Sequence, residues 1–207
     1  MIIWKKETLN YLNEGTRKYI EKNLNEANLK HFFNMKELKF IQYEDYHYLK
    51  NNVYTIPTID DIFNFYESIE GMIETNFNDE EINNVIKIVI CLLFIGNIDF
   101  VEDKNGDKCT LSQDSVPIQK FICEIMNIEY KVFADAFLFN VSIIKGETIK
   151  FPMNKAGCVA FRDTFSKEVY NRLFGFLVKR MNFALFDENI RKKVENDEDI
   201  RHIGLVD

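Results

Sequence analysis

Four cysteines and three histidines are the residues of this sequence best suited to metal binding or nucleophilic catalysis. The cysteines stand at positions 91, 109, 123 and 158, too widely spaced for a C-x-x-C pair. Three of them lie in apolar periodic segments, where a thiol behaves as a small hydrophobic group. No metal-ligand spacing links the histidines, which are His31, His47 and His202. The sequence therefore predicts reduced core thiols, no metal site and no Ser/His/Asp or Cys/His catalytic constellation.

Charged residues with catalytic potential stand side by side at Arg162 and Asp163. An acid in the first turn of a helix beside an exposed base is a simpler interpretation than a catalytic pair. A second charged group, Lys145, Glu147 and Lys150, lies in the segment KGETIK and by itself describes a solvated loop. These residues alone assign no reaction.

The composition describes a protein with a sizeable, mainly helical core. The chain has 207 residues, 46% of them hydrophobic and 14% aromatic, with eight Gly and three Pro. Its net charge of −7 argues against partners such as nucleic acid or an anionic membrane, which bind clustered Lys and Arg. The longest apolar run, residues 88–95, is far shorter than the roughly 20 residues of a membrane-spanning helix. We therefore expect a cytosolic protein.

Segments with helical periodicity would position these groups. Residues 1–30 show a weak amphipathic pattern. From Thr58 onwards, early acids precede apolar residues at helical spacing, which predicts a helix. Asn78 and the three acids after it predict a capping box at the start of another helix. Further helices are predicted over residues 116–127 and 130–140.

The longest helical pattern runs over residues 154–186, and a helix of this length would extend ~50 Å. Its apolar residues form two stripes, which predicts packing on more than one side and a core position for its Phe and Tyr side chains. Residues 98–101 predict a short strand followed by a turn, and residues 145–150 suit a hairpin or loop. Residues 203–207 predict a buried strand.

Several motifs occur in the order found in the myosin head family. Residues 82–100 resemble the family's acid-capped helix that ends in leucines and Gly-Asn-Ile-x-Phe, here from Gly96 to Phe100. The further matches are Tyr46-His47-Tyr48-Leu49, Ile59-Asp60-Asp61, Ala160-Phe161-Arg162-Asp163, Tyr170-Asn171-Arg172-Leu173-Phe174 and Asn182. Residues 203–207 resemble the family's switch II strand, whose aspartate begins an Asp-Ile-x-Gly-Phe-Glu loop.

The resemblance covers residues 41–207 and implies the upper 50-kDa subdomain of a myosin head, up to the start of switch II. It implies a mainly α fold: a helical subdomain of a P-loop NTPase-type head with a long central helix, a short hairpin and a terminal core strand. Residues 1–40 match poorly and form a separate, helical N-terminal segment in this interpretation.

The family's cofactor is Mg-ATP, which a P-loop and switch I hold. The sequence contains neither G-x-x-x-x-G-K-[S/T] nor a run of the switch I type, Asn-x-x-Ser-Ser-Arg. Because phosphate binding needs a cradle of backbone N–H groups and a Lys, we expect this chain alone to bind no ATP and to be inactive as an ATPase. By resemblance, Asp207 is the switch II aspartate, which helps to order the magnesium shell only in a complete head.

The resemblance also places residues 145–150 in the loop of the upper subdomain that touches actin. In the family, an acidic or phosphorylatable residue stands sixteen positions before an Asp-Ala-Leu-Ala-Lys-like motif. Counting back sixteen from Asp163 reaches Glu147, with Lys145 and Lys150 on either side. A fixed negative charge would thus stand where relatives use a phosphate, and actin engagement would not depend on phosphorylation.

Three interpretations remain open at this stage. The first is a part of an actin-based, ATP-driven motor of the cytoplasm and cytoskeleton, whose partners are the actin filament and the rest of a motor chain. The second is a non-enzymatic actin-binding module, in which residues 1–40 cover the surface exposed by truncation. The third is the product of a misjudged reading frame, because the predicted buried strand ends at Asp207 without a partner.

Overall fold

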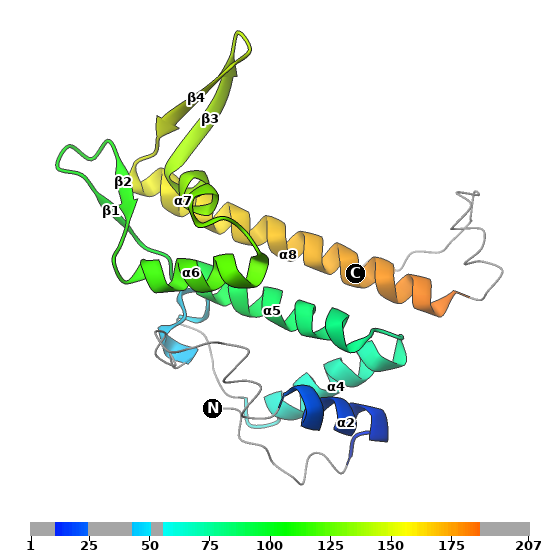
Figure 1. Ribbon diagram of the computed structural model, residues 1–207. Helices are drawn as coiled ribbons and strands as arrows, with labels where there is room; N and C mark the ends of the chain where they lie inside the picture. The colour runs from blue at the N-terminus through cyan, green and yellow to red at the C-terminus, as the bar shows by residue number, and fades with distance from the viewer. Residues whose placement is uncertain (1–10, 25–42, 51–55, 187–207) are drawn as a thin grey trace.

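The computed structural model describes residues 11–24, 43–50 and 56–186 (Figure 1). This part of the chain is mainly helical, which confirms the mainly α class, and its two small sheets are antiparallel hairpins. The elements in chain order are α2 (Glu14–Asn23), η1 (Tyr43–Asp45), η2 (His47–Leu49), α4 (Asp61–Glu74), α5 (Asp79–Gly96), β1 (Phe100–Glu102), β2 (Cys109–Leu111), α6 (Ser115–Met126), α7 (Tyr130–Leu138), β3 (Phe139–Ile144), β4 (Glu147–Pro152) and α8 (Lys155–Leu185). The predicted strand at residues 203–207 lies outside the described residues.

The helices α2 and α4 pack against the acidic end of α5 and form one hydrophobic core with it. The side chain of Asp60 caps α4 by accepting from the N–H groups of Ile62 and Phe63, so the helix begins at Asp61. The hydroxyl of Tyr19 in α2 donates to the Asn83 amide oxygen in α5 at 2.8 Å. The fully buried members of this core are Ile20, Tyr66, Ile69 and Ile82.

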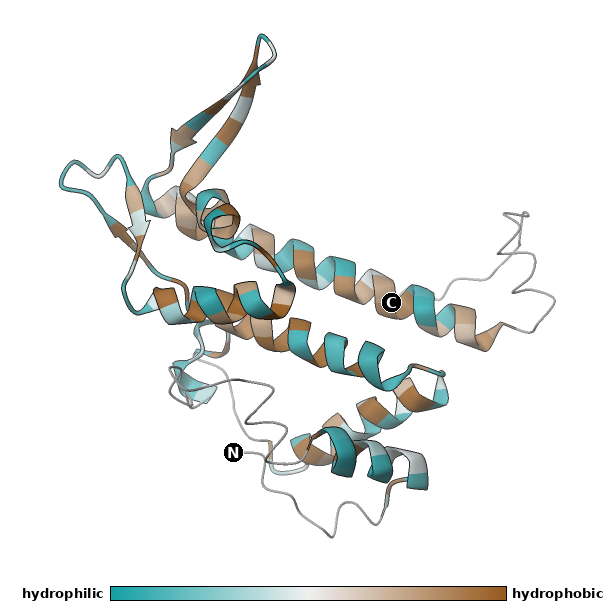
Figure 2. Ribbon diagram, viewed as in Figure 1, coloured by the Kyte–Doolittle hydropathy of each residue, from teal (hydrophilic) through white to brown (hydrophobic). Residues whose placement is uncertain are grey.

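Helix α5 begins with the predicted capping box. The Asn78 side chain accepts from the Glu81 N–H at 2.9 Å, and the Glu81 carboxylate accepts from the Asn78 N–H at 2.9 Å. The helix is polar at this end and apolar at the other, where it enters a second core (Figure 2). It therefore links the two hydrophobic cores.

The second core lies between α5, α6, α7 and the first half of α8. Its centre is a group of phenylalanine rings with centroids 4.5–6.5 Å apart, in stacked and edge-to-face arrangements that stabilise aromatic pairs. These rings belong to Phe100, Phe133, Phe137, Phe161 and Phe165. All four cysteines are buried and free in this core, as the sequence predicted.

Helix α7 ends at Leu138, two residues before the end that periodicity predicted. Phe139 and Asn140 instead pair with Pro152 and Phe151 as the first rungs of the β3–β4 hairpin. The Met153 N–H also donates to the Leu138 carbonyl at 2.9 Å and closes the base of this hairpin. The β-branched residues that follow Asn140 favour a strand over a further helical turn. The strand predicted over residues 98–101 begins two residues later, as β1, and pairs with β2 across the predicted turn.

Helix α8 confirms the predicted long central helix, with the Asn154 side chain capping its start. One apolar stripe packs inwards, against both cores. The second stripe, predicted to be core, is exposed in the described structure: Tyr170 is 56% exposed, Phe174 58% and Leu185 76%. The prediction of a core position for these side chains is wrong here because α5 and α7 cover only one side of α8 (Figure 1).

Arg180 joins the second half of α8 to the turn between α4 and α5. Its guanidinium donates to the Glu81 carboxylate at 3.2 Å and to the Asn76 carbonyl at 2.6 Å. It also lies over the Phe77 ring, 4.9 Å from the centroid. The carbonyl that accepts this bond belongs to Asn76, whose positive φ of 61° marks a tight turn between the two helices.

We predict that Arg180→Met lowers the free energy of unfolding by about 1–2 kcal/mol, because charge-assisted hydrogen bonds to the backbone are lost. Arg172→Met on the same helix is the matched control. Within the described ranges Arg172 forms its ion pair with Glu168, and the two side chains are 80% and 56% exposed, so the expected change is below about 0.5 kcal/mol. Urea denaturation of both variants checks this, and equal losses would contradict the assignment.

Candidate functional site

The β3–β4 hairpin projects from the helical body at the end where α8 begins (Figure 1). Its strands pair from Phe139 opposite Pro152 to Ile144 opposite Glu147. The turn consists of Lys145 and Gly146, both with positive φ, 53° and 84°. Two consecutive positive φ values match the twist of a two-residue hairpin turn, and glycine adopts this conformation without steric cost.

The predicted contact residues occupy different positions on this hairpin. Lys145 lies in the turn, and Glu147 is the first residue of β4; both are exposed. Lys150 lies lower on β4, and its Nζ forms an ion pair with Asp135 of α7 at 2.7 Å. The structure therefore gives Lys150 a local partner on the helical body, which the sequence pattern did not reveal.

Branched aliphatic side chains surround these charges on the hairpin. Ile143 is 76% exposed, Val141 and Ile144 are exposed as well, and the aromatic ring of Phe151 adds to this surface. Exposed apolar groups on a narrow projecting element indicate an interaction surface more strongly than scattered surface residues do. Sequence reasoning singled out only the charges of residues 145–150.

Asp207, the other predicted functional residue, lies outside the described residues.

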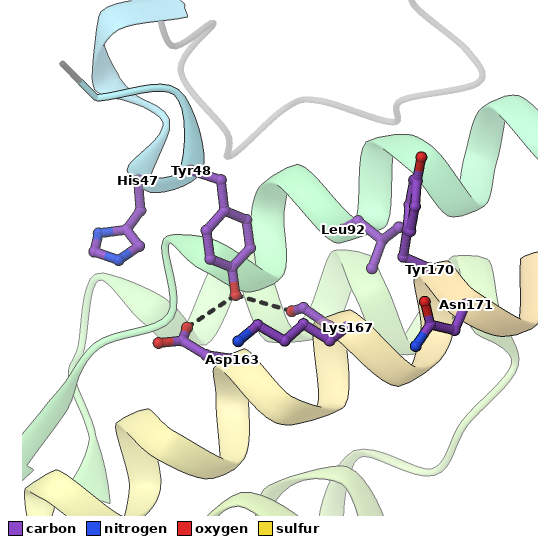
Figure 3. A pocket seen from close by; sticks show the side chains of 8 residues that line it. His47, Tyr48, Leu92, Asp163, Lys167, Tyr170 and Asn171 are labelled. Atoms are coloured by element: carbon purple, nitrogen blue, oxygen red, sulfur yellow. Dashed lines mark hydrogen bonds between the residues drawn. The ribbon is translucent and has the colours of Figure 1, made fainter. Parts of the chain in front are cut away.

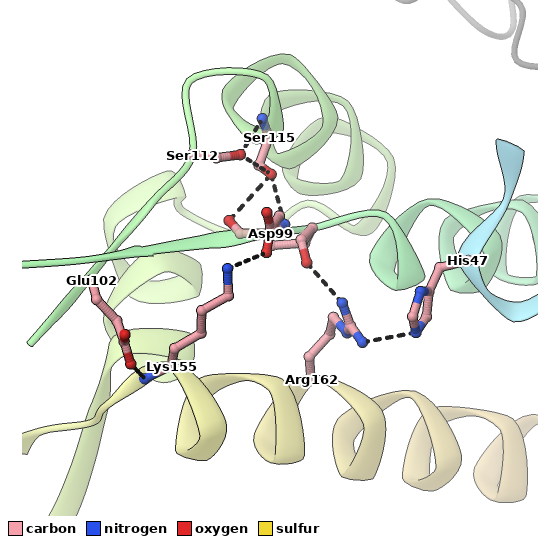
Figure 4. A network of polar contacts seen from close by, with 8 residues as sticks. His47, Asp99, Glu102, Ser112, Ser115, Lys155 and Arg162 are labelled. Atoms are coloured by element: carbon pink, nitrogen blue, oxygen red, sulfur yellow. Dashed lines mark hydrogen bonds and ion pairs between the residues drawn. The ribbon is translucent and has the colours of Figure 1, made fainter. Parts of the chain in front are cut away.

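Three motifs that are far apart in the sequence meet around Arg162 (Figure 4). The Arg162 side chain is buried, and its NH1 group donates to the Ile98 carbonyl at 3.0 Å. Its Nε donates to the Asp163 carboxylate at 2.9 Å, and its NH2 group faces His47 Nε2 at 3.1 Å. The prediction of an exposed base at Arg162 is therefore wrong. We call this group the Arg162 junction.

His47 accepts from Arg162, because a guanidinium has only donors. The ring proton of His47 must then reside on Nδ1. The backbone N–H of His47 donates to the Asn97 side chain at 2.8 Å, and the Asn97 amide donates to the Asp45 carbonyl at 3.3 Å. These bonds hold the short segment of η1 and η2 against the end of α5.

Tyr48 fastens the same segment to α8 (Figure 3). Its hydroxyl lies 3.0 Å from the Asp163 carboxylate, to which it donates, and 2.9 Å from the Ser166 hydroxyl. Burial raises the pKa of Asp163, but the hydrogen bonds from Arg162 and Tyr48 outweigh it and leave the pKa below its usual value. The carboxylate is thus a charged structural acceptor.

A shallow hollow of about 600 Å³ opens beside Tyr48 and Asp163. Its walls come from η2, α5 and α8, and the residues that line it are His47, Tyr48, Leu92, Asp163, Ser166, Lys167, Tyr170 and Asn171 (Figure 3). The Tyr48 hydroxyl and the Asp163 carboxylate at this hollow are bonded to each other, and Asp163 also accepts from Arg162 in the Arg162 junction. These contacts position η2 against α8, and they assign no reaction to the hollow.

The N-termini of α4, α5 and α8 are not free to bind the phosphates of Mg-ATP. A phosphate site needs free N–H groups at a helix start, and at α4, α5 and α8 side-chain carboxylates or amides already accept from these groups. Asp60 caps α4, Asn78 and Glu81 cap α5, and Glu102 accepts from Lys155 N at 3.1 Å at the start of α8. In the described ranges, no group of three or more His, Cys, Asp or Glu side chains is arranged to hold a metal ion. Nor does any described helix have the length and apolarity needed to cross a membrane.

Gly96 allows Tyr48 to reach its place in the junction, because a Cβ at Gly96 would lie 2.7 Å from Tyr48 Cδ2. We predict that Gly96→Ala lowers the free energy of unfolding by about 1–3 kcal/mol through this overlap. In a Tyr48→Ala background the same change should cost nearly nothing, since the ring is absent.

Gly71→Ala is the matched control, because Gly71 lies in α4 with open space around it. This change should stabilise the protein by about 0.5–1 kcal/mol through helix propensity. Denaturant unfolding of the four variants measures the coupling, and an equal cost of Gly96→Ala with and without Tyr48 would contradict the steric argument.

The chain shows clear similarity to known proteins. Unconventional myosin-Ic of Gallus gallus is 28% identical to it over 188 residues, which are 86% of this chain and 18% of that protein. Unconventional myosin-Ic-A of Xenopus laevis is 27% identical over 96% of this chain, and unconventional myosin-Ib of Rattus norvegicus is 32% identical over 75%. The matched regions are 20% and 14% of these two proteins.

The chain thus spans about a fifth or less of the length of these relatives. The family described as myosin head (motor domain) matches residues 17–207, which include the Arg162 junction and the β3–β4 hairpin. The chain belongs to the myosin head (motor domain) family.

Proposed function

We propose that this chain is the upper 50-kDa subdomain of an actin-based motor head and that the β3–β4 hairpin contacts the actin filament. The observation that carries the proposal is the position of Glu147. The acidic residue selected by its spacing from Asp163 stands at the exposed tip of a projecting hairpin. A buried or inward-facing Glu147 would have argued against a contact with a filament.

The hairpin combines features that suit a protein interface. Exposed aliphatic side chains, above all Ile143 and Val141, supply apolar area, and Glu147 and Lys145 supply charge at the tip. The ion pair between Lys150 and Asp135 fixes β4 to α7. The Lys150 side chain is half-exposed and is the third residue of the proposed actin contact, beside Lys145 and Glu147. A hairpin held at its base loses little entropy on binding.

Mg-ATP belongs, in this proposal, to a complete head and not to the residues described here. Asp207 would act there as the switch II aspartate, by helping to order the magnesium shell. The protein would act in the cytoplasm, at the actin cytoskeleton, together with the rest of a motor chain. The present residues contribute the scaffold and the filament contact.

A second candidate function is a non-enzymatic actin-binding module. It is favoured by the absence of P-loop and switch I sequences from these residues and by the occupied N-termini of α4, α5 and α8. Cosedimentation of the 207-residue chain with filaments in the absence of nucleotide separates the two candidates. Strong binding supports the module, and binding only within a complete head supports the motor subdomain.

We predict that Glu147→Lys in a complete head carrying these residues weakens actin affinity by about threefold to tenfold, because a charge at the tip of the contact is reversed. Glu124→Lys on α6 makes the same change in net charge on an exposed residue outside the hairpin and is the control. Cosedimentation at several salt concentrations measures both variants. Equal affinities for wild type and Glu147→Lys would remove Glu147 from the interface.

The 207-residue chain should show no Mg-ATP binding by calorimetry at concentrations up to about 100 μM, since no phosphate cradle is present. A P-loop-containing head measured alongside serves as the positive control. Micromolar binding by this chain would contradict the assignment of an incomplete nucleotide site.

A further inference from the structure

Histidine is the side chain whose ordinary titration falls between pH 5 and 8, and His47 is the histidine of the Arg162 junction. It is exposed, so a proton reaches the ring without any opening of the core. Its Nε2 atom lies 3.1 Å from the NH2 group of Arg162 (Figure 4). Because a guanidinium has only donors, this hydrogen bond exists only while Nε2 carries no proton. The charge state of His47 therefore decides whether the bond forms.

Protonation of His47 sets two donors and two positive charges against each other. The second ring proton turns Nε2 into a donor that faces the donors of Arg162. Arg162 is 5% exposed, and the Ile98 carbonyl and the Asp163 carboxylate hold its other nitrogens in place. Like charges repel more strongly where water is excluded. The exposed His47 ring, and not the buried guanidinium, must therefore move.

The other charged groups that α8 presents near His47 act in opposite directions. Asp163 attracts a protonated ring, but its carboxylate already accepts from Arg162 and from Tyr48. Lys167 lines the same hollow as His47 and adds a positive charge. A protonated ring that turned to Asp163 would compete with Tyr48 for the carboxylate, so it would weaken a second contact of the same segment.

Carboxylates also come from the elements on either side of His47. Asp99, which follows α5, forms an ion pair with Lys155 at 3.3 Å. Glu44 and Asp45 lie in η1 and are exposed, so salt and water screen their charges. Because these two residues belong to the same segment as His47, they move with it and do not hold it on α8.

The η1–η2 segment depends on contacts with the helices for its position. Each of its two 3-10 helices has three residues, and helices of this kind are too short to be stable alone. The His47 N–H bond to Asn97 and the Tyr48 bonds to Asp163 and Ser166 attach the segment to α5 and α8. Such a segment opens locally at a lower free energy than the core helices do. The loss of one attachment therefore shifts it towards the open state.

We propose that His47 and Arg162 form a pH-sensitive clamp, in which neutral His47 holds the η1–η2 segment on α8 and protonated His47 releases it. The neutral ring makes the bond in the native structure, whereas the unfolded chain accepts a proton on this ring freely. The bond therefore contributes stability above the pH at which an unfolded histidine titrates, about 6.5. The contribution is lost as the pH falls through this range.

Nitrogen-15 NMR of the full chain at about pH 8 tests the geometry of the clamp, because it reports which ring nitrogen of His47 carries the proton. The expected result is a proton on Nδ1 and none on Nε2. A proton on Nε2 would prevent this atom from accepting from Arg162 and would overturn the proposal. The measurement needs no variant.

Amide hydrogen exchange of the full chain tests the release. The His47 N–H donates to the Asn97 side chain, and the Leu49 N–H donates to the Tyr46 carbonyl at 2.9 Å. The protection factors of these two amides, which exclude the intrinsic pH dependence of exchange, should fall by about threefold to tenfold between about pH 7.5 and 5.5, as expected for the loss of one hydrogen bond. The amide of Ile95 inside α5 should keep its protection.

Two variants assign the pH dependence to His47. His47→Gln keeps a neutral acceptor and removes the titration, so the protection of Leu49 should no longer depend on pH. The double variant His31→Gln/His202→Gln removes the other two histidines of the chain and should retain the wild-type dependence. A dependence that persists in His47→Gln or disappears in the double variant would overturn the proposal. Constant protection of His47 and Leu49 in the wild type would overturn it as well.

Discussion

The buried guanidinium of Arg162 is the interaction on which the arrangement of the described elements depends. A buried charge must find partners, because leaving it unpaired costs several kcal/mol. Arg162 meets this requirement with the Ile98 carbonyl after α5, with Asp163 on its own helix and with His47 in η2. The three partners must therefore stay together, and α8, the end of α5 and the η1–η2 segment keep one relative position.

The hairpin that projects from the body depends on the same part of α8. The strands β1 and β2 lie on the first turn of α8, and β4 runs directly into Asn154, which caps this helix. The Met153 N–H and the Lys150–Asp135 ion pair then tie the base of β3–β4 to α7. The Arg162 junction thus fixes the platform from which Glu147 is presented.

Local sequence signals predicted the elements with strong caps and unbroken periodicity. Asn78 and Glu81 formed the expected capping box, and the long helix begins one residue after Asn154. Periodicity failed where tertiary pairing competes with it, as at Phe139, which leaves α7 for a strand. It also failed on α8, because an apolar stripe shows only that a face avoids water and does not identify what covers it.

Charged residues were the least predictable part of the candidate site. Arg162 looks like a surface base in the sequence, and only the fold brings Ile98 and His47 to it from positions far along the chain. The structure places Glu147 at the hairpin tip, and its role in an actin contact stays a prediction, while the partner of Lys150 on α7 needed the three-dimensional arrangement. Family membership rests on residues 17–207 as a whole and on no single site.

The most direct test of the central claim is residue-resolved hydrogen exchange of these residues with and without actin filaments, in a complete head. The proposed contact predicts that actin slows exchange in β3 and β4, above all around Ile143 and Glu147, and leaves the α4–α5 turn unchanged. Binding to actin with unchanged exchange throughout the hairpin would contradict the account.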